Sequence, residues 1–114
     1  MPRYPATIEP LDPDVLDCLL EVMDPEVGLS IVDLGLVYRA TRGNDGIAVA
    51  LTLTTRACPL GEMIVEDARE RLARRFQDVP LVAVTLIWNP QWNPDRITDR
   101  GLELLGHRPR RAAS

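Results

Sequence analysis

The sequence predicts an α+β fold, a two-layer sandwich in which a small mixed three-stranded sheet carries helices on one face. Three observations point to this class. Apolar residues repeat at helical spacing over about 59–77, whereas residues 47–54 alternate apolar with small or hydroxyl side chains, the period of a strand. A second apolar run follows over 81–88, so strand, helix and strand are expected to form one right-handed parallel crossover.

The chain is expected to begin with an irregular arm over residues 1–11 and a short helix over 13–23. The arm contains three prolines. Asp12 followed by Pro13 is typical of a helix start, because aspartate accepts from free backbone N–H groups and proline already has the helical φ. Apolar residues follow at helical spacing: Val15, Leu16, Leu19, Leu20 and Met23.

The segment after the first helix is expected to form a loop and then a β-hairpin. Asp24 precedes Pro25 and should end the helix, since the residue before a proline avoids helical backbone. Residues 24–34 show no clean period, which predicts an ordered loop. From Gly35 the pattern becomes extended, and RGNDG is a glycine-bearing hairpin turn that leads into the alternating strand.

The second half of the chain has the most regular helical pattern. The helix over about 59–77 has acids early and arginines late, as the helix dipole favours. The strand at 81–88 is apolar on both faces, which predicts a central, covered position in the sheet. After the loop NPQWNP, Thr98 is expected to cap a short closing helix that runs through Leu105. The element order is therefore α-β-β-α-β-α.

Length and composition bound the class of protein. The 114 residues are expected to form one domain, with 107–114 as a flexible basic tail; such a chain buries roughly two-thirds of its unfolded surface without a disulfide or metal. The net charge of −4 argues against nucleic-acid binding. Since no apolar run reaches membrane-spanning length and no signal peptide is evident, we expect a cytoplasmic protein without membrane contact, with free thiols.

Cys58 is the leading candidate for chemistry. If Pro59 is the first helical position, Cys58 is the N-cap and its sulfur faces three free backbone N–H groups, those of Leu60, Gly61 and Glu62. These donors and the positive end of the helix dipole would favour a nucleophilic, metal-binding thiolate. A small buried cysteine at a strand end is the alternative, and placement alone leaves both open. Cys18, on the apolar side of a short helix, is expected only to pack.

Polar residues near Cys58 in the predicted fold are the next candidates. Thr54 and Thr55 follow the strand and could hydrogen-bond the sulfur or a ligand, whereas Thr52 is better explained by β-propensity. Asp24 and Glu26 flank a proline and could polarise a thiol or bind a cation, although solvated loop acids are common. The sole histidine lies in the tail, so no Cys–His hydrolase pair is evident.

Three motifs in order resemble the SufT-like family, also called domain of unknown function fifty-nine, which includes PaaD-type proteins. They are DPEVGLSIVDLGLVY, TLTTRACP and WNPQWNPDRIT followed by LLG, and they extend from about Leu11 to Gly106. The family often has N-P-P-W where this chain has NPQW. PaaD-type members carry a cysteine-rich C-terminal extension, whereas this chain ends in an arginine-rich tail, which favours the general SufT-like branch.

The resemblance implies an accessory role in maturing iron–sulfur proteins, with cluster scaffolds, carriers and recipient apoproteins as partners. It implies no established enzyme activity, and it marks Cys58 as the essential-looking residue, with Asp24, Glu26, Thr54 and Thr55 around it. An iron–sulfur cluster normally takes four thiolate-class ligands, so one domain with Cys58 is expected to hold a cluster, iron or persulfide only transiently, shared with a partner or a second subunit.

Two other functions remain open from the sequence. One is a cysteine-dependent enzyme acting on small thioesters or redox thiols, for which Asp24 and Glu26 are the only candidate acids or bases. The other is a structural adaptor that binds through the loop around Trp92 and has a buried, inert Cys58. A homodimer is compatible with each of these functions.

Overall fold

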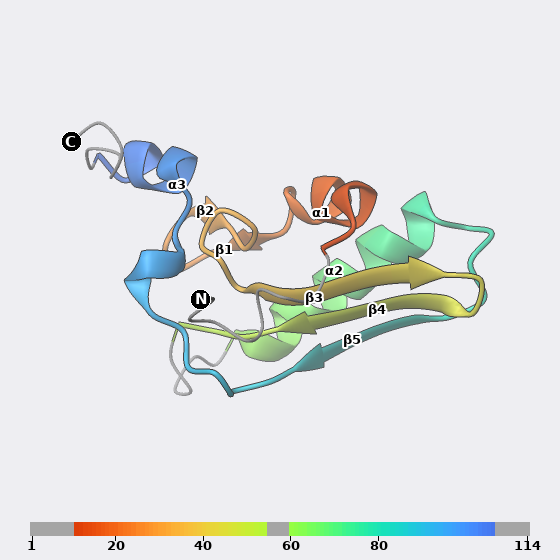
Figure 1. Ribbon diagram of the computed structural model, residues 1–114. Coiled ribbons are helices and arrows are strands. Elements are labelled where there is room, and N and C mark those ends of the chain that lie inside the picture. Colours follow the sequence, from red (N-terminus) through yellow and green to blue (C-terminus); the bar gives the residue numbers. More distant parts are fainter. Residues whose placement is uncertain (1–10, 55–59, 107–114) are drawn as a thin grey trace.

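The computed structural model describes residues 11–54 and 60–106, and its α+β architecture confirms the predicted fold class. A three-stranded sheet lies in one layer, and helices α1 and α2 pack on one face of it (Figure 1). The elements in chain order are α1 (Pro13–Leu19), β1 (Met23–Asp24), β2 (Leu29–Ser30), β3 (Val37–Gly43), β4 (Gly46–Leu51), α2 (Gly61–Arg75), β5 (Val82–Leu86), the 3₁₀ helix η2 (Pro94–Arg96) and α3 (Asp99–Leu104).

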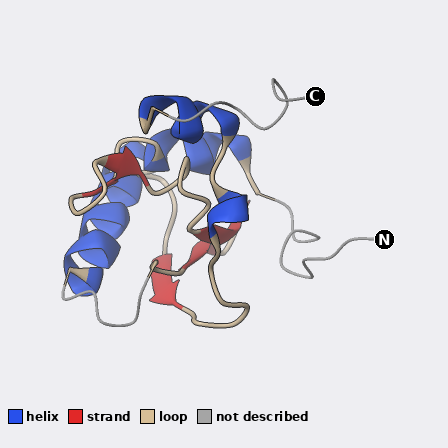
Figure 2. Ribbon diagram, turned by 90° about the vertical axis from the view of Figure 1, so that its left-hand side faces the viewer, coloured by secondary structure: helices blue, strands red, loops and turns tan. Residues whose placement is uncertain are grey.

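The sheet is mixed, as expected, with strand order β3-β4-β5. The tight turn predicted at RGNDG joins β3 and β4 as an antiparallel hairpin. Strands β4 and β5 are parallel, with Ile47 opposite Val82 and Leu51 opposite Leu86, and α2 connects them. Helix α2 thus begins near the carboxyl end of β4 and returns the chain to the start of β5 (Figures 1 and 2).

The predicted central position of the last strand is wrong, because β5 lies at an edge of the sheet. The hairpin with β3 occupies one edge of β4, so the crossover can only add β5 at the other edge. Its apolar residues are half-buried and Thr85 is exposed. A strand that is apolar on both faces therefore need not be a central strand of its sheet, because β5 has this pattern at an edge.

The region after the first helix also differs from the prediction. Helix α1 ends at Leu19, not at residue 23, because the chain turns there and the Val22 N–H donates to the Leu19 carbonyl. This turn buries Val22 completely and starts strand β1. The expected loop over 24–34 contains part of a two-stranded antiparallel hairpin, β1–β2, which is too short to show a period in the sequence.

The core lies between the sheet and helices α1 and α2. Fully buried side chains come from both layers, including Leu19 of α1, Leu51 of β4 and Leu72 of α2. Two ion pairs lie at the surface beside this contact, Arg71 of α2 with Glu21, just after α1, at 2.9 Å and Arg75 of α2 with Asp17 of α1 at 2.9 Å. No helix within the described ranges combines the length and apolar character needed to cross a membrane.

Candidate functional site

The described residues on either side of the Cys58 segment lie close together at the carboxyl end of β4. The pairing with β3 extends beyond β4, since the Thr52 N–H donates to the Leu36 carbonyl at 2.9 Å. Leu53 is then buried, and a Cβ at Gly61 would lie 2.8 Å from its Cδ1. The first residue of α2 therefore lies close to Leu53, just beyond the end of β4, and a side chain at Gly61 would require the Leu53 side chain to move.

The predicted helix cap at Cys58 is wrong. Helix α2 begins at Gly61, with Leu60 in the N-cap position, since apolar spacing predicts a helix without fixing its first residue. Cys58 lies two positions earlier in the chain; Cys58 and Thr55 are both outside the described residues. No side chain within the described ranges caps the helix, which leaves the first-turn N–H groups of α2 without a side-chain acceptor from these residues.

Asp24 has a structural task that the sequence did not reveal. Its side chain is buried, and its Oδ1 accepts from the backbone N–H groups of Glu26 at 2.9 Å and Val27 at 3.3 Å. The Asp24 carbonyl also accepts from the Gly28 N–H at 2.7 Å. This carboxylate therefore holds the β1–β2 turn, while the Glu26 side chain is exposed on it.

The β1–β2 hairpin lies at the same end of the sheet as the carboxyl ends of β4 and β5 (Figure 1). Backbone hydrogen bonds connect the segment after this hairpin to the end of β4. The Leu36 N–H donates to the Ile31 carbonyl, and the Leu36 carbonyl accepts from the Thr52 N–H. Thr54, half-buried, follows directly on this ladder. The structure thus brings three predicted site residues, Asp24, Glu26 and Thr54, to one end of the sheet.

Two buried hydroxyl groups at this end were missed by sequence reasoning. Thr52 is 1% exposed and Tyr38 is 3% exposed, and neither hydroxyl oxygen has a hydrogen-bond partner within the described part of the chain. The Arg96 guanidinium lies 4.2 Å from the centroid of the Tyr38 ring, and burial raises the pKa of the Tyr38 hydroxyl against the opposing effect of that cation. In the sequence, Thr52 carried only the signal of an ordinary strand residue.

The C-terminal segment closes over this end of the sheet. The Trp92 indole N–H donates to the Leu34 carbonyl at 2.7 Å, so Trp92 packs rather than projecting from its loop. Asp33 Oδ1 accepts from the Thr98 hydroxyl at 2.9 Å, and the same hydroxyl oxygen caps α3 by accepting from the Gly101 N–H, as predicted. Helix α3 consequently packs beside β2 rather than on the sheet.

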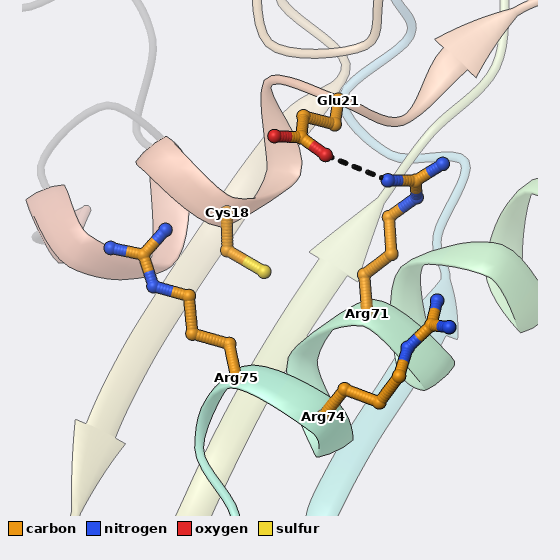
Figure 3. Close-up of a pocket in the computed structure, with 5 residues that line it drawn as sticks. All are labelled: Cys18, Glu21, Arg71, Arg74 and Arg75. Carbon is orange, nitrogen blue, oxygen red and sulfur yellow. Dashed lines mark hydrogen bonds and ion pairs between the residues drawn. The ribbon is translucent and has the colours of Figure 1, made fainter.

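Cys18 packs between α1 and α2, as predicted, and is 7% exposed. It lines a shallow pocket of about 450 Å³ with Glu21 and three arginines, Arg71, Arg74 and Arg75 (Figure 3). Burial raises the pKa of the Cys18 thiol, with Arg75 acting in the opposite direction. Cys18 is therefore a poor nucleophile in the folded chain.

The described residues contain no group of three or more His, Cys, Asp or Glu side chains that could hold a metal ion. A metal site built from these residues alone is therefore not present.

Comparison with known proteins gives a consistent result. The family model described as "Iron-sulfur cluster assembly protein" matches residues 12–84, more than half of the chain. The chain is 38% identical over 99 residues to the Fe-S protein maturation auxiliary factor YitW of Bacillus subtilis, covering 86% of this chain and 96% of that protein. It is 36% identical over 86 residues to the Fe-S protein maturation auxiliary factor SufT of Staphylococcus aureus, covering 75% and 97%.

A solved structure supports the same relationship. The chain resembles a domain of unknown function fifty-nine from Bacillus anthracis with a TM-score of 0.78 and 34% identity, covering 83% of this chain and 91% of that one. The resemblance to the SufT-like family is confirmed by these matches. The chain therefore belongs to the iron–sulfur cluster assembly protein family.

Proposed function

We propose that this chain is an accessory factor in iron–sulfur protein maturation, and that it acts through transient contact of Cys58 with a cluster, iron or persulfide rather than as an enzyme. The observation that carries the proposal is the close approach of Leu53 and Gly61, which brings the described residues on either side of the Cys58 segment together at the start of α2, where no side chain within the described ranges caps the helix. Relatives named as maturation auxiliary factors support the same role.

The number of thiols favours a cluster or iron that is shared with a partner over one that this chain holds alone. Iron–sulfur clusters normally take four thiolate-class ligands, and this chain contains two cysteines, of which Cys18 is buried between α1 and α2. Cys58 then supplies one ligand, and the others come from a scaffold, carrier or recipient apoprotein. Such sharing suits a transfer step, because a partner can remove the cargo by replacing a single ligand.

The neighbouring polar residues take different parts in this proposal. Asp24 fixes the turn that carries Glu26, so its contribution is positional. The hydroxyl groups of Thr54 and Thr55 are candidates to hydrogen-bond the sulfur of Cys58 or its cargo. Glu26, exposed on the same end of the sheet, is the candidate contact to a bound cation or a basic partner group.

The two rival functions receive less support. An adaptor that binds through Trp92 would present that side chain to a partner, but the indole N–H is engaged by Leu34 and the ring packs on the core. A cysteine-dependent enzyme needs a base near the sulfur, and one oxygen of the Asp24 carboxylate is already committed to its own turn.

The first experiment measures the alkylation rate of Cys58 against pH in Cys18→Ala, in which Cys58 is the only thiol. We expect a thiolate pKa below the ordinary value of about 8.5. The second replaces the gene in cells with Cys58→Ser and scores the activity of iron–sulfur enzymes, with Cys18→Ala as the matched control. Loss of maturation in Cys58→Ser alone is expected; maturation equal to wild type would refute the proposed role of Cys58.

A further inference from the structure

The pocket beside Cys18, between α1 and α2, takes no part in the proposed function. Its volume of about 450 Å³ lies in the range of small-molecule sites. Figure 3 shows Arg75 on one side of the Cys18 sulfur, and Arg71 and Arg74 on the other. The pocket therefore carries positive charge on both sides of one sulfur atom.

Two of the three guanidinium groups are held in place by acids. Arg71 donates from Nη1 to Glu21 at 2.9 Å and from Nε to Asp67 at 3.0 Å. Arg75 donates from Nη1 to Asp17 at 2.9 Å. A guanidinium group has five N–H donors, so both arginines keep donors that these acids do not use. The two side chains are therefore fixed in position and still able to bind a further acceptor.

Arg74 differs from these two, because no residue in the described ranges forms an ion pair with it. It lies three residues after Arg71 on α2, a spacing at which side chains are neighbours and like charges repel each other. The helix dipole favours arginines in the last turn, where Arg74 and Arg75 lie, but Arg71 lies before that turn. A bound anion would offset the repulsion among the three side chains.

The remaining lining residues add little negative charge. Cys18 is 7% exposed, and because burial raises the pKa of its thiol, this group is uncharged at neutral pH. Glu21 is the one acid among the described residues that line the pocket. Three guanidinium groups and one carboxylate give the lining a net charge of +2, which Asp17 and Asp67 offset in part from outside the pocket. The chain as a whole has a net charge of −4.

We propose that this pocket binds a small ligand with two anionic groups joined by a short link. One group contacts Arg75, the other contacts Arg71 and Arg74, and the link lies over the Cys18 thiol. Carboxylate and phosphate groups both match the planar donors of a guanidinium, so the shared chemistry is an oxyanion at each end of the ligand. A ligand with a single anionic group would leave one side of the pocket unused.

This binding site does not depend on the proposed function. The candidate site lies at the start of α2, whereas the three arginines lie in the second half of that helix. The ligand would contact α2 and lie over Cys18 of α1, so it should hold the two helices together. A ligand that binds the folded chain and not the unfolded chain also raises the temperature of unfolding.

The test is a titration of the full chain with glutarate and with pyrophosphate at constant ionic strength, followed by NMR. At least one of them should bind with a dissociation constant of about 1 mM or lower and shift the Nε–H signals of Arg74 and Arg75 together. Acetate and phosphate, each with one anionic group, are the matched controls and should bind about 10-fold more weakly. A dissociation constant above about 10 mM for both two-headed anions would overturn the proposal, as would controls that bind equally well.

Variants locate the binding and separate it from the role of Cys58. Arg74→Gln and Arg75→Gln should each weaken binding by about 10-fold, and Arg74→Gln removes no ion pair within the described residues, so its fold should be unchanged. Arg69→Gln, on the same helix but outside the pocket lining, makes the same change in net charge and should alter binding by about 2-fold at most. Cys58→Ser should bind as wild type does, whether or not Cys58 acts in maturation. Equal weakening in Arg69→Gln and Arg74→Gln, or wild-type affinity in Arg74→Gln, would contradict the proposal.

Discussion

The two ends of the three-stranded sheet differ in the burial of their polar side chains. At the β3–β4 turn the polar side chains are exposed, and Arg42 forms surface ion pairs with Asp12 and Asp14. At the other end, where β4 and β5 finish, lie the buried polar residues of the described part of the chain (Figure 1). They are Asp24, Ser30, Asp33 and Thr52.

This difference indicates at which end of the sheet the fold depends on particular side chains. Burying a polar group is costly unless it is hydrogen-bonded, and exposed turns avoid that cost. Asp24, Ser30 and Asp33 each meet the requirement by accepting hydrogen bonds from nearby groups, whereas the Thr52 hydroxyl does not within the described residues. Substitutions at the end with the candidate site should therefore have larger effects than those at the hairpin turn.

The largest effect is expected from Gly35→Ala. Gly35 has a φ of 74°, and a Cβ there would lie 2.3 Å from the Arg96 carbonyl oxygen, a backbone atom that cannot move aside alone. We expect a loss of about 3 kcal/mol or more in the free energy of unfolding, measured with urea. Gly43→Ala at the hairpin end, where nothing lies within 4 Å, is the control and should change it by about 0.5 kcal/mol at most. Equal losses would contradict the comparison.

Asp24→Ala is expected to cost about 2 kcal/mol, because two backbone N–H groups lose the acceptor that holds the β1–β2 turn. Asp24→Asn keeps an acceptor oxygen and should recover much of the stability. Glu26→Ala, at an exposed position in the same turn, should be close to neutral. Chemical denaturation of the three variants checks this order, and an Asp24→Ala variant as stable as Glu26→Ala would show that the turn does not need the carboxylate.

Thr52→Val is expected to stabilise the protein, in contrast to the two preceding substitutions. It replaces a buried hydroxyl that has no partner among the described residues by a methyl group of the same shape, so unfolding should require about 1 kcal/mol more. Thr41→Val, near the hairpin turn, removes a long, 3.5 Å contact to the Ala48 carbonyl and should change stability little. Thermal melts measure both, and a destabilised Thr52→Val would mean that the hydroxyl is satisfied in solution.

The smallest effect concerns Cys18, away from both ends. Burial raises the pKa of its thiol, so the folded state prefers the protonated form. The stability that this preference contributes is fully present below the pKa of the thiol in the unfolded chain and is lost as pH rises through the raised pKa of the folded state. Wild type should therefore lose stability at alkaline pH relative to Cys18→Ala, and parallel stability curves above pH 9 would contradict the raised value.

Much of the fold could be predicted because its signals are local. The spacing of Leu60, Ile64, Ala68 and Leu72 predicted the helix now seen at Gly61–Arg75, and Asp12 and Thr98 cap their helices as their positions indicated. The cap expected at Cys58 was wrong because apolar spacing marks the face of a helix and not its first residue, which is Gly61.

The candidate site was predictable only in part. Its motif residues could be selected from their order in the chain, and the family relationship they indicated is confirmed. The same motif did not separate Asp24, which holds a turn, from Glu26, which is exposed, because both are acids beside one proline. Thr52 and Tyr38 were missed since their burial depends on the segments that pack over them.

The sequence by itself therefore determined the periodic elements, the mixed sheet and the family, because each follows from spacing or motif order within short stretches of chain. Only the tertiary structure decided that β5 is an edge strand, that Asp24 is buried and that α2 starts against Leu53. These features depend on contacts between segments far apart in the chain, and burial and strand order arise from such contacts rather than from the propensity of any one segment.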